Sequence, residues 1–253
     1  MRCLRLSGTT ADLAHALDLL HVHAEVLGVV ERENELEVGL VDAPLPELPG
    51  VRIVELPAGG TTTGLEQDCA IRVADDLVVR PPWVASPVGF AAIELVVPRG
   101  MAFGSGEHAS TQAALALLHR TWRPGTVGCT DVGTGSGILL AYAAARGCVS
   151  LCGCDLEAEA VAAARELLPA AVIVHGGPEL LTMRTASVVA NLTGAELGGC
   201  LAAILRLWDR QAPLVLAGMR AEEVAPIARR VPAVELAREE RAGFTALAFA
   251  PAD

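Results

Sequence analysis

The strongest constraint on the fold is an alternation of strand-like and helix-like segments between residues 107 and 218. Short apolar segments rich in valine predict strands, and the segments between them have the spacing of amphipathic helices. The expected strands are 126–132, 149–155, 171–176, 186–191 and 212–218, and the expected helices are 108–122, 138–147, 157–168 and 194–208. This alternation is typical of a parallel sheet covered by helices on both faces. The segment 233–249 breaks the pattern and predicts two antiparallel strands around a turn at Ala242–Gly243.

The first part of the chain predicts a smaller α/β domain. Residues 1–57 contain a strand-like start, an amphipathic segment with helical spacing and further strand-like segments. A stretch rich in glycine and threonine follows and indicates a linker over residues 58–70. The second domain is therefore expected to span residues 71–253. Near its start, the segments 69–83 and 91–98 each predict one strand.

Charge and composition argue against several classes of function. The formal net charge is −11, so direct nucleic-acid binding through clustered cations is not expected. No apolar run is long enough to cross a bilayer and no secretory signal begins the chain, so no membrane association is expected. The seven cysteines lack the paired spacing of metal ligands, which indicates a reduced, cytoplasmic environment. Cys152 and Cys154 alternate along a strand and are expected to be small buried side chains, so no metal site is predicted.

A glycine-rich turn follows the first of the parallel strands. The sequence DVGTGSG at 131–137 connects that strand to a helix, where glycines permit a tight turn and let a ligand approach free backbone amides. Asp155 ends the next strand, where a carboxylate can accept hydrogen bonds from ribose hydroxyls. The glycine spacing differs from that of dinucleotide binders. It suits S-adenosylmethionine, which has no pyrophosphate and whose ammonium Asp131 can bind. The alternative is that Asp131 and Asp155 only cap the following helices.

Asn191 ends the fourth expected strand and is one of only two asparagines in the chain. The carboxyl ends of parallel strands line the ligand crevice, so the amide of Asn191 is expected to point toward the transferable methyl group. The alternative is an N-cap for the helix expected at 194–208. The Pro-Pro-aromatic sequence that follows such an asparagine in enzymes methylating nucleobase amines is missing, which argues against a flipped base as the substrate.

Four stretches resemble the PrmA family of bacterial methyltransferases, which modify the ribosomal stalk protein L11. They are LVVRPPW at 77–83, GMAFGSGEHAST at 100–111, DVGTGSGIL at 131–139 and VVANLTGAEL at 188–197. The resemblance covers about residues 65–250. It implies a class I methyltransferase domain, Rossmann-like, with a mostly parallel seven-stranded sheet and an antiparallel edge hairpin. The small α/β domain would dock the protein substrate.

The same resemblance implies an activity and a set of site residues. Methyl groups would pass from S-adenosylmethionine to lysine ε-amines, or to the α-amine, of L11. The implied cofactor-binding residues are Phe103, Gly104, Ser105, Gly106, Thr111, Asp131, Gly133, Gly135, Asp155, Gly177 and Asn191. The catalytic residues are expected to be Asn191, Thr111 and His108. Asn191 would hold the acceptor nitrogen through its side-chain and backbone oxygens, and His108 or water would take the proton. His108 is also placed to cap the helix that begins there.

The chain departs from the family pattern at several positions. Ser105 stands where threonine is usual, and Arg99 replaces the usual proline before GMAFG. The segments 64–76 and 209–213 also differ from their family counterparts, which leaves the docked substrate open. The alternatives are lysine methylation of another protein, such as the electron-transfer flavoprotein β subunit, and a diverged cofactor-binding domain without turnover. A nicotinamide-dependent oxidoreductase is a further alternative, which the glycine spacing and the AFGSG run disfavour.

Overall fold

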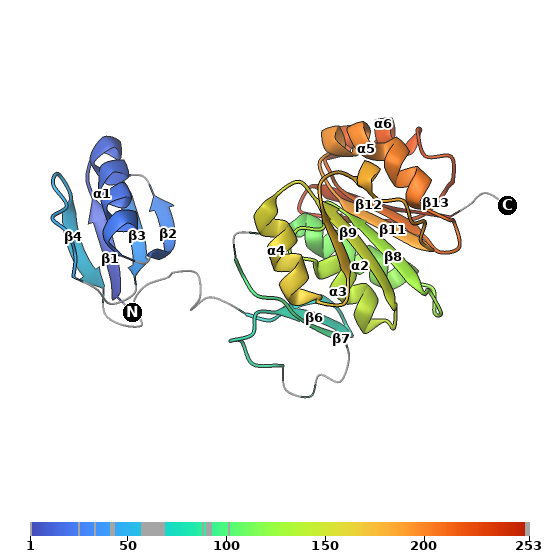
Figure 1. Cartoon of the computed structure of the whole chain (residues 1–253), viewed down its shortest axis with the longest axis horizontal. Helices are drawn as coiled ribbons and strands as arrows, with labels where there is room; N and C mark the ends of the chain where they lie inside the picture. Colours follow the sequence, from blue (N-terminus) through green and yellow to red (C-terminus); the bar gives the residue numbers. More distant parts are fainter. Residues whose placement is uncertain are drawn as a thin grey trace. The chain divides into compact units, whose positions relative to one another are not determined.

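The computed structural model of the chain divides into two compact units, Met1–Asp68 and Cys69–Asp253 (Figure 1). It describes residues 2–24, 26–32, 34–40, 44–56, 69–87, 89, 93–100 and 102–250. Apart from Cys69 and Ala70, the linker predicted at 58–70 lies outside these described ranges.

The first unit is a four-stranded sheet with one helix. Its elements are β1 (Arg2–Ser7), α1 (Thr10–His23), β2 (Val26–Arg32), β3 (Glu35–Leu40) and β4 (Arg52–Leu56), in the strand order β2-β3-β1-β4. Strand β3 lies antiparallel to β1 and to β2, and β4 lies antiparallel to β1. Helical spacing places Leu13, Ala16 and Leu20 on one face of α1, where they form a buried cluster with Leu4 and Leu6 of β1. The α/β character predicted for this part of the chain is therefore observed.

The second unit contains a seven-stranded sheet. Its strands are β8 (Gly128–Val132), β9 (Ser150–Asp155), β10 (Val172–His175), β11 (Ser187–Asn191), β12 (Leu214–Met219), β13 (Val234–Arg241) and β14 (Phe244–Ala250). The order is β10-β9-β8-β11-β12-β14-β13, with β14 antiparallel to both of its neighbours and the other adjacent pairs parallel. The chain runs outward from β8 to β10 and then returns to β11, so the order reverses between β8 and β11. The predicted, mostly parallel seven-stranded sheet with an antiparallel edge hairpin is confirmed.

Helices cover both faces of this sheet (Figure 1). They are α2 (Ala109–Thr121), α3 (Ile138–Ala145), α4 (Ala158–Leu167), α5 (Gly194–Leu207) and α6 (Ala221–Ala228), with a short 3-10 helix, η2 (Pro178–Leu180). Val189 of β11 packs in the cluster that contains α2, α3 and α4, whereas Val188 and Ala190 pack with α5 and α6. Burial on both faces explains why the strands read as continuous apolar runs. Helix α6 was not among the expected helices, because it has only eight residues and contains Pro226.

A second, three-stranded sheet corrects one expectation from the sequence. Its strands are β5 (Ile71–Ala74), β6 (Leu77–Arg80) and β7 (Ile93–Val96), in the order β5-β6-β7. The single strand expected at 69–83 is wrong, because the chain turns at Asp75 and Asp76 and pairs β5 with β6 antiparallel. Aspartate favours turns, since its side chain can bond to nearby backbone amides. Strand β7 then pairs parallel with β6 and leads into the GMAFG segment.

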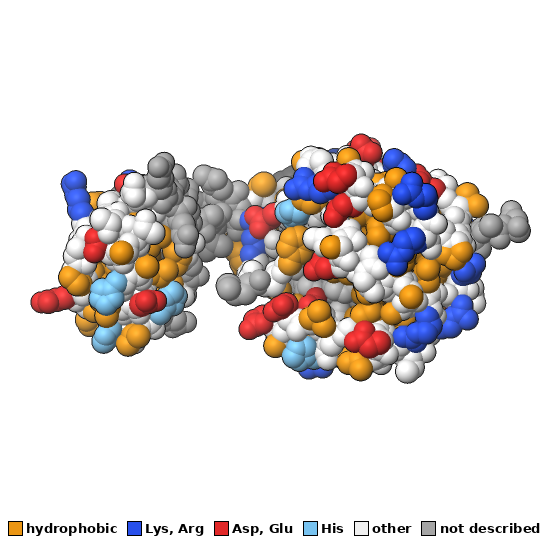
Figure 2. All heavy atoms as spheres, turned by 90° about the horizontal axis from the view of Figure 1, so that it is seen from above, with side chains coloured by type: hydrophobic (Ala, Val, Ile, Leu, Met, Phe, Trp, Pro, Cys, Tyr) orange, Lys and Arg blue, Asp and Glu red, His pale blue; other side chains and the backbone are white. Residues whose placement is uncertain are grey.

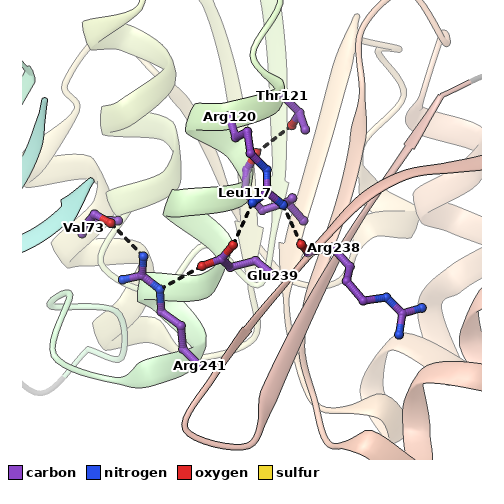
Figure 3. Close-up of polar contacts among 7 residues, drawn as sticks. All are labelled: Val73, Leu117, Arg120, Thr121, Arg238, Glu239 and Arg241. Carbon is purple, nitrogen blue, oxygen red and sulfur yellow. Dashed lines mark hydrogen bonds and ion pairs between the residues drawn. The ribbon is translucent and has the colours of Figure 1, made fainter. Parts of the chain in front are cut away.

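A polar network joins α2 to this small sheet and to the edge hairpin (Figure 3). Arg120 Nη1 donates to Glu239 Oε2 over 3.0 Å, and Arg241 Nε lies 3.3 Å from Glu239 Oε1. Arg241 Nη2 also donates to the backbone oxygen of Val73 over 2.8 Å. These contacts attach the last turn of α2 and strand β5 to β13. The first turn of the same helix carries residues of the candidate site.

Candidate active site

A cavity of about 650 Å³ lies at the carboxyl ends of the parallel strands in the second unit. Its walls include Val132 at the end of β8, Asp155 at the end of β9 and Asn191 at the end of β11. The strand order reverses here, and ligands of open α/β sheets bind at such switch points. The volume lies in the range of small-molecule and cofactor sites. The structure therefore brings the predicted residues Asp155 and Asn191 to one cavity, whereas Asp131 of β8 is not among the residues that line it.

The glycine turn between β8 and α3 forms one wall of this cavity. Gly133, Gly135 and Gly137 have φ angles of 73°, 53° and 86°, a region that favours glycine. The turn lies close to β9, because the amides of Gly133 and Thr134 both donate to the backbone oxygen of Cys154, over 2.9 and 3.0 Å. A β-carbon at Gly135 would collide with the backbone oxygen of Phe103. The turn therefore needs glycine both for its conformation and for close packing.

Replacing Gly135 with alanine is expected to destabilise the second unit more than a matched replacement elsewhere. Gly125 has a φ of 82°, and nothing in the described structure lies within 4 Å of the position that its β-carbon would take. Gly125→Ala therefore costs only the left-handed conformation, about 1–2 kcal/mol. Gly135→Ala adds a collision with backbone, and we expect a further loss of about 1–3 kcal/mol. Denaturant unfolding of the two variants measures the difference. Equal losses would contradict the assigned close packing of the two loops.

Asp131 lies behind the glycine turn and is fully buried. Its Oδ2 accepts a hydrogen bond from the Thr134 hydroxyl over 2.9 Å, and its Oδ1 has no partner among the residues that the structure describes. Burial raises the pKa of Asp131 to about 8; the Thr134 hydrogen bond opposes this rise, and the nearby charge of Asp155 adds to it. A buried carboxylate oxygen without a partner is costly unless a ligand supplies a donor. The chemistry of Asp131 therefore fits a cationic ligand such as an ammonium.

Asp155 has two roles in the structure. Its Oδ2 accepts from the Gly135 amide over 2.8 Å, and its Oδ1 accepts from the amide of Glu157, the N-cap residue of α4, over 3.0 Å. The predicted capping alternative is thus partly realised, since Asp155 orders the start of α4. It also lines the cavity, and each carboxylate oxygen can accept a further hydrogen bond. Contact with ribose hydroxyls remains compatible with this geometry.

The two glycine-rich stretches of the sequence are docked on each other. The amide of Ser136 donates to the Phe103 backbone oxygen over 2.8 Å, and the Ser136 hydroxyl donates to the Gly104 backbone oxygen over 2.8 Å. A β-carbon at Gly106 would contact Val79 of β6 too closely, so the loop also packs against the small sheet. Phe103 lines the cavity and is half exposed, whereas Gly104, Ser105 and Gly106 stand outside its wall. The first stretch is therefore a cover whose backbone rests on the second.

Asn191 lines the cavity, and within the described part of the chain its amide oxygen is buried without a partner. Its Nδ2 donates to Thr111 Oγ1 over 3.3 Å, and its Oδ1 is buried without a partner among the described residues. Thr111 is fully buried in the first turn of α2 and orients the amide from behind. The alternative that Asn191 caps α5 is wrong, because Thr193 is the N-cap and forms a capping box with Glu196. The amide oxygen of Asn191 therefore has an unused capacity to accept a hydrogen bond.

His108 lines the cavity and is also the N-cap of α2. Its Nδ1 accepts from the Ser110 amide over 3.3 Å and lies 2.8 Å from the Ser110 hydroxyl. An Nδ1 that accepts from a backbone amide carries no proton, so the proton of neutral His108 is on Nε2. The ring packs between Phe103 and Phe244, with centroid distances of 5.2 and 4.6 Å. His108 therefore caps α2, as the alternative proposed. A proton-accepting role for His108 stays a prediction.

Several cavity residues were not singled out from the sequence. Phe244 follows the turn of the edge hairpin, and its ring lies under the Arg220 guanidinium at 3.7 Å. Leu192 and Thr193, which follow Asn191, also line the cavity, as does the predicted Gly177. A large apolar side chain directly after a hairpin turn is a weak signal, because only the sheet order shows that this turn reaches the site. The sequence predicted the hairpin, but it did not predict that the hairpin brings Phe244 to the cavity.

Neither a metal centre nor a membrane span is found in the part of the chain that the structure describes. No group of three or more His, Cys, Asp or Glu side chains among those residues could hold a metal ion. Cys152 and Cys154 are buried on β9 in the apolar cluster beneath α5, as predicted. Among the described helices, none is long and apolar enough to cross a membrane.

The strand order and the position of the glycine turn define a Rossmann-like fold of the class I methyltransferase type. A crystal structure of the ribosomal protein L11 methylase from Lactobacillus delbrueckii subsp. bulgaricus shares this fold. Its TM-score is 0.66 at 21% sequence identity, and the match covers 73% of this chain and 99% of that chain. Residues 68–235 match the model of the family described as ribosomal protein L11 methyltransferase (PrmA), and the chain belongs to this family.

Curated relatives of the same name match part of the chain. The ribosomal protein L11 methyltransferase of Dechloromonas aromatica (strain RCB) is 33% identical over 155 residues, which are 57% of this chain and 50% of that protein. The protein of the same name from Syntrophotalea carbinolica is 38% identical over 121 residues, 44% of this chain and 39% of that protein. The chain thus spans about half the length of the curated relatives that it matches, or less.

Proposed function

We propose that this protein transfers methyl groups from S-adenosylmethionine to amine nitrogens of ribosomal protein L11, on lysine ε-amines or the α-amine. Family membership supports the reaction class. The observation that carries the proposal is the buried, unpaired Oδ1 of Asn191 at the cavity wall. Such an oxygen suits an N–H donor. Activity on a ribosomal protein would place the enzyme in the cytoplasm.

The residues around the cavity fit S-adenosylmethionine. Asp131 does not itself line the cavity, but its neighbours Val132 and Gly133 do, and its buried, unpaired Oδ1 would bind the methionine ammonium. Asp155, which lines the cavity, would accept from the ribose hydroxyls. Gly133 and Gly135 would let the cofactor lie against the backbone, beneath the cover that carries Phe103. When bound, the cofactor supplies an electrophilic methyl group on a sulfonium. Catalysis by the chain then consists mainly of orienting the acceptor and providing a matched polar site.

The charge of the cavity wall suits cationic ligands. Its charged side chains are Asp155, Glu157 and Glu196, and no arginine lines it among the described residues. Elsewhere the surface carries both signs of charge, as the face in Figure 2 shows. A sulfonium and an approaching lysine are both positive, so the negative wall lowers the cost of bringing them together.

The acceptor amine must lose a proton before it can attack. For an ordinary lysine at pH 7 this costs about 3.4 pK units, or roughly 4.6 kcal/mol. The unpaired Oδ1 of Asn191 would accept one N–H of the neutral amine and so orient its lone pair toward the methyl group. Thr111, which accepts from Nδ2, holds the amide in that orientation. Water at the cavity, or His108, would take the proton.

Transfer of a labelled methyl group tests the reaction and the substrate together. The purified protein is incubated with methyl-labelled S-adenosylmethionine and, in parallel, with L11, with the electron-transfer flavoprotein β subunit, or with lysate from a strain that lacks this protein. We expect label in L11 and in one lysate band of the same mass. Label only in another protein would retain the reaction and change the substrate. Binding of the cofactor without any transfer would favour a domain without turnover.

A further inference from the structure

An ion pair spans the cover loop, the segment between β7 and α2. Arg99 Nη1 lies 2.6 Å from Glu107 Oε1, and the Arg99 side chain is only 16% exposed. The second oxygen, Oε2 of Glu107, accepts from the Ser105 hydroxyl over 3.0 Å. Glu107 therefore contacts both Arg99, which precedes the loop, and Ser105, which lies within the loop.

This ion pair lies next to the anchored parts of the cover. Gln112 Nε2 donates to the backbone oxygens of Gly106 and Glu107, over 3.2 and 3.0 Å, which attaches the end of the loop to α2. Glu107 is followed directly by His108, the N-cap of α2, and the same helix turn carries Thr111. Through Glu107, Arg99 thus joins the start of the loop to its fixed end. An intact pair restricts the positions that residues 102–106 can adopt.

The contacts also explain why Ser105 stands outside the cavity wall. Its hydroxyl is bonded to Glu107, so it stabilises the loop and does not face the site. Among the described residues 102–106 of the cover, only Phe103 reaches the cavity, and its position depends on the backbone bond that Ser136 donates to it. Holding both ends of the loop together keeps Phe103 over the cavity before any ligand arrives. Order present before binding lowers the entropy cost of binding.

We propose that Arg99 and Glu107 form a latch that holds the cover closed over the methionine end of the cofactor, which makes Arg99 a positioning residue for cofactor binding. This inference rests on the proposed function, because it needs S-adenosylmethionine as the ligand. Arg99 acts through the loop and touches neither the cofactor nor the acceptor. Its loss therefore weakens binding of the cofactor in the ground state and in the transition state alike, and kcat is retained.

The test measures binding of S-adenosylmethionine by calorimetry to the wild-type protein and to Arg99→Ala and Glu107→Gln. We expect the Kd to rise about threefold to tenfold in each variant, the scale of a partly exposed ion pair supported by a hydrogen bond. The kcat at saturating cofactor stays within twofold. Hydrogen exchange of the amides in 102–106 is faster in both variants. In the charge-swapped double variant, Arg99→Glu with Glu107→Arg, at least half of the increase in Kd is reversed.

Arg238→Ala is the matched control, because Arg238 pairs with Glu235 over 2.9 Å on β13, away from the cavity wall. Its Kd is expected to equal that of the wild type. If Arg99→Ala does not fold, Glu107→Gln alone tests the latch, since it keeps the shape of the side chain and removes its charge. Unchanged Kd and exchange in the latch variants, with tight binding by the wild type, would overturn the latch alone. Failure of the wild type to bind the cofactor would overturn both the proposed function and the latch.

Discussion

Replacing Asn191 with alanine is expected to lower kcat about 100- to 1000-fold and to leave the Kd for S-adenosylmethionine within threefold. The variant loses the unpaired Oδ1 that orients the acceptor amine, while Asp131, Asp155 and the glycine turn, which carry most of the proposed cofactor contacts, are untouched. The loss corresponds to about 2.7–4 kcal/mol, the scale found when one oriented polar group is removed from a reacting site. Single-turnover transfer to L11 and calorimetry with the cofactor measure the two effects.

Thr111→Val provides the companion variant. It keeps the shape of Thr111 and removes the hydroxyl oxygen that accepts from Asn191 Nδ2. We expect a smaller fall in kcat, about tenfold, because the amide remains but is no longer held in one orientation. Full turnover in Asn191→Ala would remove the acceptor role from this residue. Loss of cofactor binding in the same variant would move Asn191 to the cofactor site.

Replacing Asp131 with asparagine is expected to weaken cofactor binding at least 100-fold and to stabilise the cofactor-free protein. The asparagine side chain replaces the carboxylate with an uncharged oxygen and an NH2 donor, so the methionine ammonium loses its ionic partner. The folded-state pKa of about 8 lies above the ordinary value of 3.8, so Asp131 favours folding fully below about pH 4 and loses that contribution as the pH rises to about 8. At pH 7 the raised pKa lowers the free energy of unfolding by up to about 4 kcal/mol, and Asp131→Asn removes this loss.

Two measurements follow for this variant. The Tm of the cofactor-free wild type is expected to fall between pH 5 and pH 8. The Tm of Asp131→Asn is expected to fall by less over the same range. At pH 7 the variant is expected to melt higher than the wild type by up to about 8–16 °C. A lower Tm for Asp131→Asn at pH 7 would contradict the assignment of Asp131 as a buried group whose ionisation opposes folding.

Cofactor affinity is expected to depend on pH through the same carboxyl. Below its pKa of about 8, Asp131 must release a proton before it can pair with the ammonium. The association constant is therefore expected to rise about tenfold from pH 6 to pH 7 and more slowly from pH 7 to pH 8. Calorimetry in buffers of different ionisation enthalpy would show a proton released on binding at pH 7. The dependence is expected to be absent in Asp131→Asn, and its persistence there would assign it to another group.

The periodic parts of the fold could be predicted from the sequence, because local patterns encode them. The parallel strands, the helices between them and the edge turn at Ala242–Gly243 each have a signal within about 15 residues. The hairpin at Asp75 and Asp76 was missed because the apolar residues continue on both sides of a two-residue turn. Helix α6 was missed because Pro226 interrupts a short helical pattern. Whether such short helices and strands form depends on tertiary contacts, which a local sequence pattern does not contain.

The site could be predicted only in part, for a related reason. The strand-end residues Asp131, Asp155 and Asn191 are recognisable because parallel topology brings their ends together. The docking of Phe103 on the glycine turn and the arrival of Phe244 depend on contacts between distant segments. No local pattern shows that Asn191 is paired with Thr111, 80 residues earlier. These contacts decide which of the candidate residues face the ligand.

The most direct test of the proposed function is the mass of intact L11 after incubation with the purified protein and S-adenosylmethionine, followed by peptide sequencing of the product. We predict that the mass of L11 rises in steps of one methyl group, that the groups lie on lysine ε-amines or on the α-amine, and that Asn191→Ala gives no rise on the same timescale. An unchanged mass of L11 with a wild-type protein that binds the cofactor would contradict the proposed function.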